Sequence, residues 1–182
     1  MNQKQLIMAI GDGGCKIVKS LITDKDKVFI DTDLEVIDKY NGIRIGTKIC
    51  GKYSTAGDIK LGYLAVLESA KEIEKIIKNY EEIFLVTLLG GGTSSGSTPE
   101  IINICQKNNK KVVVFTGLPA KHEGKKRANI ALNSLENMQR KCEVKLQSIE
   151  LDQNYIGSLA GFLEYKKDLV LALLDGYFNT KN

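Results

Sequence analysis

The fold class can be inferred from one stretch near the middle of the chain, Ile83-Phe-Leu-Val-Thr-Leu-Leu-Gly-Gly-Gly-Thr-Ser-Ser-Gly96. Its apolar part, residues 83–89, predicts a strand buried on both faces, as in a parallel sheet. A helix is predicted to follow and to run to about Gln106, with Pro99 in its first turn. Four glycines and three hydroxyl residues thus join a buried strand to a helix. Because a glycine-rich backbone can approach an anion closely, the segment is typical of a phosphate-binding loop.

Strands and helices alternate along the rest of the chain. Short apolar runs, or in one case an alternating pattern, predict strands at 6–10, 28–30, 43–50, 112–115 and 144–149. A tight turn is predicted at 11–14, before apolar residues recur at helical spacing. Further helices are predicted at 61–77, 124–138 and 158–178. This alternation predicts an α/β fold, a three-layer, Rossmann-like parallel sheet with helices on both faces.

Composition limits the class of protein. With 182 residues, 43% of them hydrophobic, the chain is expected to form a single nucleotide-binding domain over 1–182 that ends with the helix at 158–178. The net charge of +4 is spread beside glutamates, which indicates a solvated surface and no nucleic-acid partner. The longest apolar run, 169–174, is too short for a membrane span. Four cysteines without paired spacing indicate a reduced, cytoplasmic setting and no metal centre.

Glycine-rich or polar segments follow four of the predicted strands, at 11–14, 31–33, 89–96 and 116–123. Ligands of parallel α/β sheets bind outside the carboxyl ends of the strands, so this convergence predicts a nucleotide site. Asp31 and Asp33 are candidates for a ribose hydroxyl or a magnesium-bound water, and equally for capping the next helix. Cys15 lies near a helix start, where a thiol can be acidified, but packing is the favoured interpretation.

The motifs resemble those of the tubulin and FtsZ superfamily along nearly the whole chain. Gly90-Gly-Gly-Thr-Ser-Ser-Gly96 is similar to the GGGTG(S/T/A)G signature, and Gly11-Asp-Gly-Gly-Cys-Lys-Ile17 resembles the first phosphate loop. Ser54-Thr-Ala-Gly57 stands in the place of the loop that senses the γ-phosphate. Asp31-Thr-Asp33 and Glu123-Gly-Lys-Lys-Arg127 resemble further nucleotide-contacting segments of the family.

The resemblance implies a guanine-nucleotide site for GTP or GDP, with Mg²⁺ as a candidate companion ion, in a cytoskeletal or cell-division protein. The implied phosphate-binding residues are Gly11, Asp12, Gly13, Gly14, Cys15, Ser54, Thr55, Ala56, Gly57, Gly90, Gly91, Gly92, Thr93, Ser94, Ser95 and Gly96. The implied ribose- and base-binding residues are Asp31, Asp33, Glu123, Arg127, Asp152, Asn154, Phe162 and Lys166.

Some positions depart from the family pattern. Ser94 replaces a glycine, which predicts a strained residue at positive φ in the phosphate loop. Lys166 stands where the family has an asparagine that reads guanine, and an ammonium donates but does not accept. The sequence stops after the last predicted helix, where the family continues into an acidic catalytic loop and a second domain. We therefore expect binding with weak or partner-dependent hydrolysis, and self-association or a tubulin/FtsZ-like partner.

Two other functions remain open. Gly11-x-Gly13 followed by Asp31 fits the start of the dinucleotide-binding fingerprint of NAD enzymes, although Lys16 takes the place of its third glycine. A non-enzymatic interaction module that has lost its nucleotide is the other alternative, favoured by Ser94 and Lys166. An ordinary P-loop NTPase is the least favoured of these functions, because GxxxxGK[ST] does not occur.

Overall fold

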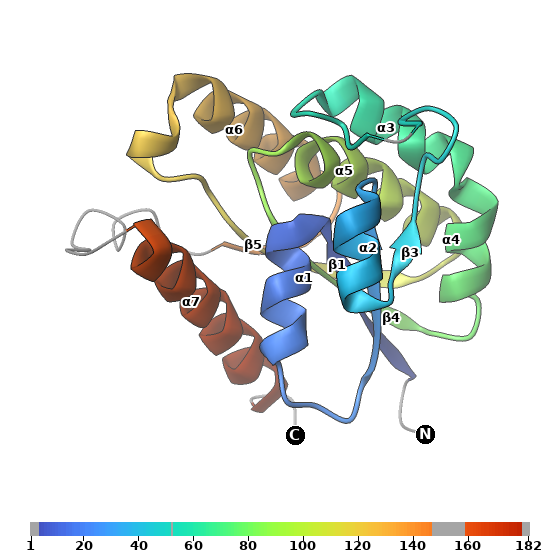
Figure 1. Cartoon of the computed structure of the whole chain (residues 1–182). Helices are drawn as coiled ribbons and strands as arrows, with labels where there is room; N and C mark the ends of the chain where they lie inside the picture. The colour runs from blue at the N-terminus through green and yellow to red at the C-terminus, as the bar shows by residue number, and fades with distance from the viewer. Residues whose placement is uncertain (1–3, 52, 147–158, 180–182) are drawn as a thin grey trace.

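The computed structural model describes residues 4–51, 53–146 and 159–179 (Figure 1). The described strands form one six-stranded parallel sheet in the order β3-β2-β1-β4-β5-β6. The strands are β1 (Gln5–Ile10), β2 (Asp26–Asp31), β3 (Ile43–Arg44), β4 (Glu82–Leu88), β5 (Lys111–Gly117) and β6 (Glu143–Leu146). The helices are α1 (Gly11–Ser20), α2 (Leu34–Tyr40), α3 (Ile59–Glu68), α4 (Ala70–Ile77), α5 (Gly92–Lys107), the short η1 (Lys121–Glu123), α6 (Lys125–Gln139) and α7 (Leu159–Asn179).

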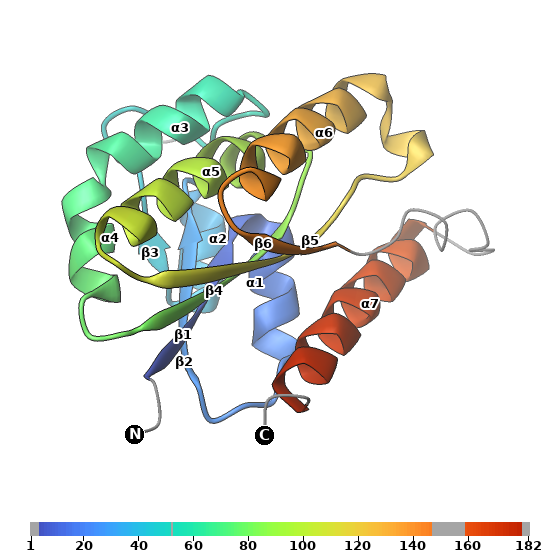
Figure 2. The ribbon, with the colours of Figure 1, turned by 180° about the vertical axis from the view of Figure 1, so that it is seen from behind.

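Helices cover both faces of the sheet, which confirms the three-layer α/β class. On one face α3, α4, α5 and α6 pack against alternate strand residues such as Met8 and Leu85. On the other face α1, α2 and α7 pack against the intervening residues, such as Ala9 and Phe84. Figure 2 shows α5 between α3 and α6 on the first face, with α7 on the opposite side of the sheet beside α1. Burial on both faces explains why the strands are continuously apolar.

Three local predictions along the chain are corrected by the structure. The strand expected at 43–50 is only Ile43–Arg44, because the chain turns at Gly46, which has a φ of 67°. The helix expected at 61–77 is divided at Ser69, whose hydroxyl oxygen accepts a hydrogen bond from the Gly46 N–H at 3.0 Å. The turn expected at 11–14 is the first turn of α1, which begins at Gly11.

Pro99 lies well inside α5 and not in its first turn, as the sequence had predicted, because α5 begins seven positions earlier at Gly92. A proline in a helix leaves the carbonyl four residues before it without its usual donor. That carbonyl belongs to Ser95, and it accepts a hydrogen bond of 2.9 Å from the Ser134 hydroxyl of α6. Packing of α6 on α5 therefore offsets the bond that Pro99 removes.

The last two elements agree with the predictions as far as the structure describes them. β6 is Glu143–Leu146, and residues 147–149 of the predicted strand lie outside the described residues. α7 is Leu159–Asn179, close to the expected 158–178. Of the helices described here, none has the length and apolar character that a membrane crossing requires.

Candidate functional site

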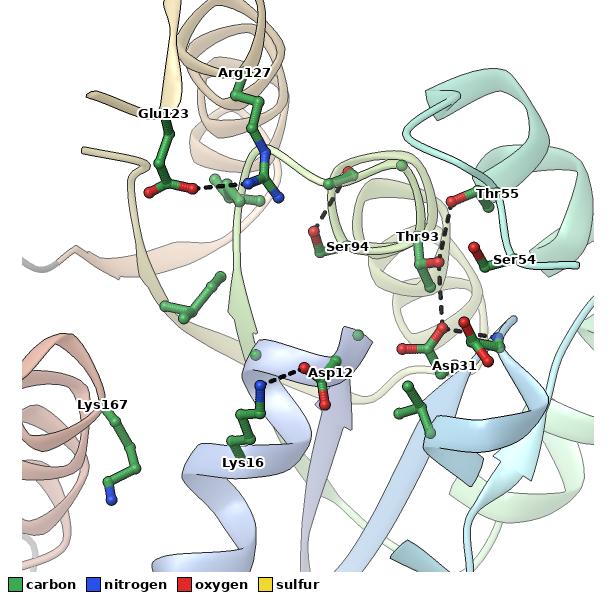
Figure 3. Close-up of a pocket in the computed structure, with 18 of the residues that line it drawn as sticks. Asp12, Lys16, Asp31, Ser54, Thr55, Thr93, Ser94, Glu123, Arg127 and Lys167 are labelled. Atoms are coloured by element: carbon green, nitrogen blue, oxygen red, sulfur yellow. Dashed lines mark hydrogen bonds and ion pairs between the residues drawn. The ribbon is translucent and has the colours of Figure 1, made fainter. Parts of the chain in front are cut away.

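A cavity of about 580 Å³ lies at the carboxyl ends of β2, β1 and β4, which are adjacent in the sheet (Figure 3). The chain leaves β1 toward β2 on one side and later returns to β4 on the other, so the cavity lies at the switch point of the strand order. Open parallel sheets bind ligands at this point. Its walls come from α1, α2, α5, α6, α7 and the loops between them.

The first glycine loop brings α1 directly against the sheet. Gly11 has a φ of 77°, which favours glycine, and it is the first residue of the helix. A methyl group placed on Gly14 would lie 2.3 Å from the Val86 carbonyl oxygen, so the helix start touches the backbone of β4. Asp12 and Lys16 form an ion pair of 2.6 Å on the exposed side of α1. The N-terminus of α1 therefore points at the cavity from a position that only glycine permits.

The second glycine loop, Gly90–Gly92, places the N-terminus of α5 at the same cavity. Gly90 has a φ of 106°, and its N–H donates to the Ser95 hydroxyl oxygen at 2.8 Å. Its carbonyl accepts from Arg127 Nε at 3.3 Å. Within the described residues no side chain caps α5 at Gly91 or α1 at Ile10. The first N–H groups of a helix have no partner inside the helix, so both N-termini present free donors to an anion.

Ser94 is not a strained residue, and this expectation was wrong. It lies in the first turn of α5, and the non-glycine residues at positive φ in the described chain are Asn41, Ala56 and Asn109. The Ser94 hydroxyl donates to the Gly91 carbonyl at 3.4 Å. Because the residue is helical, serine fits this position without strain.

A buried cluster of hydroxyl groups joins three segments at the inner end of the cavity. The Thr93 hydroxyl oxygen lies 2.8 Å from that of Thr32 and 3.3 Å from that of Thr55. It also donates to Asp31 Oδ1 at 3.4 Å. The end of β2, the loop after β3 and the start of α5 are therefore tied together. Thr32 lay inside the predicted Asp31–Asp33 motif but was not singled out.

The two aspartates of that motif differ. Asp31 is buried and accepts from the N–H groups of Thr32 at 2.6 Å and Asp33 at 3.0 Å. Burial raises the pKa of Asp31, and these two hydrogen bonds oppose the rise. Asp33 accepts from the Glu35 N–H at 2.9 Å and is the N-cap of α2, so its capping role is confirmed. Both aspartates line the cavity, and contact with ribose or Mg²⁺ stays a prediction.

The segment after β5 closes the cavity on the side of α6. Arg127 and Glu123 form an ion pair of 2.9 Å, and Glu123 also accepts from the Ala120 N–H at 2.8 Å. Since Arg127 also donates to Gly90, this segment is held against the second glycine loop. Figure 3 shows the pair above the space between α1 and α7.

Most of the predicted site residues meet at this cavity. Those that line it are Gly11, Asp12, Gly13, Asp31, Asp33, Ser54, Thr55, Gly91, Gly92, Thr93, Ser94, Glu123 and Arg127. Those that are described but do not line it are Gly14, Cys15, Ala56, Gly57, Gly90, Ser95 and Gly96.

Local packing and backbone conformation explain why several of these residues do not line the cavity. The Cys15 side chain is part of the core between α1 and the sheet, where burial raises its pKa to about 12, so packing is its role. Gly96 faces α3, since a methyl group there would lie 2.2 Å from the Ile59 carbonyl oxygen. Ala56 and Gly57 form an exposed left-handed turn with φ of 48° and 83°.

Four predicted residues are not placed by the structure. Asp152 and Asn154 lie outside the described residues. Phe162 and Lys166 belong to α7, but their side chains are outside what is described. Other lining residues were not singled out from the sequence, although two of them, Lys16 and Leu89, lay inside the predicted loops; they are Lys16, Val36, Leu88, Leu89, Glu164 and Lys167. Lys16 had one signal, its position four residues after Asp12 on a helix that begins at the loop.

The fold and the cavity define a doubly wound α/β domain with a cavity at its switch point. The chain belongs to the tubulin/FtsZ family: the family model described as the Tubulin/FtsZ family, GTPase domain, matches residues 4–147. Two similar relatives are the cell division protein FtsZ of Helicobacter pylori, 30% identical over 144 residues, and cell division protein FtsZ 1 of Methanocaldococcus jannaschii, 31% identical over 146 residues. These alignments cover 73% and 75% of this chain, and 37% and 40% of the relatives.

Solved structures show the same fold. An empty FtsZ dimer from M. jannaschii superposes with a TM-score of 0.87 at 24% identity, covering 97% of this chain and 55% of that one. The GDP-bound monomer of CetZ1 from Haloferax volcanii superposes with a TM-score of 0.83 at 17% identity, covering 93% and 58%. The chain thus spans a little over half of these structures and about two fifths of the curated relatives.

Proposed function

We propose that this chain binds GTP or GDP in the cavity, with the phosphates at the N-termini of α1 and α5. One observation carries the proposal: two helices that begin with glycine, both without a side-chain cap in the described structure, converge on one cavity at the switch point. Two sets of free N–H groups and two positive helix ends suit a pyrophosphate. Family membership and the GDP in the CetZ1 structure support guanine.

Mg²⁺ fits this site as an ion carried by the nucleotide. Among the described residues no group of three or more His, Cys, Asp or Glu side chains could hold a metal by itself. Mg²⁺ usually keeps several waters and needs one or two carboxylates beside the phosphates. Asp31 and Asp33, which line the cavity beside Thr93, would supply them and orient the bound waters.

Hydrolysis by the chain alone is expected to be slow. No catalytic residue is assigned within the cavity, and we propose that self-association or a tubulin/FtsZ-like partner completes an active site. We also propose a role in the cytoskeleton or in cell division, which membership of the family supports. The test is phosphate release at rising protein concentration: brisk turnover that does not depend on concentration would contradict this part of the proposal.

A substitution at the cap of α5 tests the binding itself. Gly91→Asp places a carboxylate at the N-cap, where aspartate stabilises a helix, so the protein should stay folded. The same carboxylate competes with phosphate for the N–H groups, and we expect GDP affinity to fall by about a hundredfold. Gly91→Asn is the matched control, because asparagine caps the helix without a charge and should weaken binding less.

The decisive measurement is calorimetry with GDP, GTP, ATP and NAD⁺, together with chromatography of any nucleotide released when the purified protein is denatured. Binding of guanine nucleotides that Gly91→Asp weakens about a hundredfold supports the proposal. Preferential binding of NAD⁺ would favour the dinucleotide enzyme. Failure of all four to bind would leave the interaction module as the better account.

A further inference from the structure

A groove of about 360 Å³ lies between α3 and α6 on the face of the domain away from α7. Its floor is the first half of α5, which lies between these two helices (Figure 2). None of the residues that line it lines the cavity at the switch point. The groove is therefore separate from the proposed nucleotide site, and nothing in that function uses it.

The α3 side of the groove is apolar and exposed to solvent. Ile59 and Tyr63 line it one helical turn apart, and they are 44% and 43% exposed. Pro99 of the floor and Ile130 of α6 extend this apolar lining across the groove. A contiguous apolar surface with a polar rim is typical of a site that binds another protein segment.

The α6 side carries two side-chain amides, Asn133 and Asn137. Both are exposed and line the groove, and neither makes a hydrogen bond to another residue of the described chain. Four helical residues place them about 6 Å apart along the groove, and alternate residues of an extended chain repeat at about 6.6 Å. Because an amide both donates and accepts, the two side chains match successive alternate peptide groups of an extended backbone.

Lys141 holds an ammonium group at the end of this row of amides. Its N–H donates to the Met138 carbonyl at 2.9 Å, and its carbonyl accepts from Gln106 Nε2 at 2.6 Å. Its ammonium donates to the Pro99 carbonyl at 3.2 Å, and no carboxylate of the described chain forms an ion pair with it. An ammonium has three donors, so this fixed group keeps two for an anion.

The charges that line the groove favour an acidic ligand. Lys60 lines the α3 side, opposite Lys141, and is exposed. Glu100 is the one carboxylate among the described lining residues, and it already accepts from Asn103 Nδ2 at 2.6 Å. Two ammonium groups thus face one carboxylate that is already hydrogen-bonded. This small excess suits a few carboxylates and is too low for a nucleic-acid backbone.

We propose that the groove binds an extended segment of a partner protein in which acidic and apolar residues alternate. Asn133 and Asn137 bond the backbone of the segment, and its carboxylates pair with Lys141 and Lys60. Its apolar side chains cover the exposed stripe on α3. Paired amides at a peptide spacing bind a repeating backbone, which a free anion does not have. This inference does not depend on nucleotide binding.

The test uses a fluorescein-labelled octapeptide of alternating aspartate and leucine, with fluorescence anisotropy of the full chain as the measurement. The reference peptide has asparagine in place of aspartate, and we expect it to bind about tenfold more weakly. Lys141→Gln should weaken the aspartate peptide about tenfold and leave the asparagine peptide unchanged, whereas Lys141→Arg should retain the wild-type affinity. Asn133→Ala combined with Asn137→Ala should weaken both peptides about tenfold, because both share the backbone.

Matched controls lie outside the groove. Lys110 also donates its ammonium to a carbonyl, that of Lys78 at 2.9 Å, and Asn129 is an exposed amide of α6. Neither lines the groove, so Lys110→Gln and Asn129→Ala should leave both affinities unchanged. Urea midpoints equal to that of wild type would exclude loss of the fold as the cause of weaker binding. Failure of the aspartate peptide to bind, or binding that neither groove variant weakens, would overturn this inference, whatever the affinity for GDP.

Discussion

The two ends of the cavity are built in opposite ways. At the inner end, the backbone and buried hydroxyl groups are in tight contact: Thr93 and Ser94 are 8% and 6% exposed. At the end between α1 and α7, the lining side chains are long and charged, and that of Glu164 is 65% exposed. Close backbone packing fixes the shape of the inner end, whereas the outer end is formed by long side chains that are more exposed. Substitutions at the inner end should therefore change stability more than those at the outer end.

The largest effect is expected from Gly14→Ala at the inner end. The added methyl group would lie 2.3 Å from the Val86 carbonyl oxygen, and neither backbone can shift without moving α1 from the sheet. We expect the free energy of unfolding to fall by about 3 kcal/mol or more in urea titrations. Gly176→Ala is the control, since no described atom would lie within 4 Å of its methyl group and alanine should stabilise α7 by up to about 1 kcal/mol. Equal midpoints for Gly14→Ala and wild type would show that the inner end is not rigid.

Thr93→Val should have the next largest effect. Valine keeps the shape but removes the hydroxyl that contacts Thr32, Thr55 and Asp31. Buried polar partners would be left unsatisfied, so we expect a loss of about 1–2 kcal/mol in urea unfolding. Thr93→Ser retains the hydroxyl and should recover most of this loss. A valine variant as stable as wild type would show that the hydroxyl cluster does not stabilise the fold.

Asp31→Asn probes the same cluster through pH. Burial raises the pKa of Asp31 above its ordinary value of 3.8, so the folded state binds the proton more tightly than the unfolded state. The contribution of Asp31 to stability is therefore fully present below pH 3.8 and is lost as the pH rises through the raised pKa. Asparagine does not titrate, so the variant should gain stability relative to wild type over this window. Parallel stability curves for the two proteins would contradict the assignment.

Ser94→Gly tests whether serine fits the first turn of α5. Because Ser94 is helical, glycine should lower the free energy of unfolding by about 0.5–1 kcal/mol through its greater backbone freedom. GDP affinity should change little, since the N–H groups remain. An increase in stability would show that serine is strained at this position.

The smallest effect on stability is expected from Lys167→Gln at the outer end. Ion pairs at a solvent-exposed surface contribute little to folding, so the urea midpoint should equal that of wild type. A clearly lower midpoint would mean that the outer end is structural as well, and the contrast between the two ends would fail.

The alternation of strands and helices, the α/β class and most of the inner site were predictable from the sequence. Strands covered on both faces must be apolar throughout, and parallel strands place the loops that follow them at one edge of the sheet. Gly90–Gly92 and Asp31–Asp33 are therefore visible as local patterns. Each of these motifs consists of residues that are adjacent in the sequence, so a local pattern is enough to recognise it.

Contacts between distant segments were not predictable. Pro99 is tolerated inside α5 because Ser134 bonds the Ser95 carbonyl across 39 residues, and the long helix divides at Ser69 because Gly46 binds its hydroxyl. Thr93 meets Thr32 across 61 residues. Lys16 and Lys167 reach one wall only because α1 and α7 pack on the same face of the sheet. Such pairs arise from packing, which brings together residues that no local pattern relates.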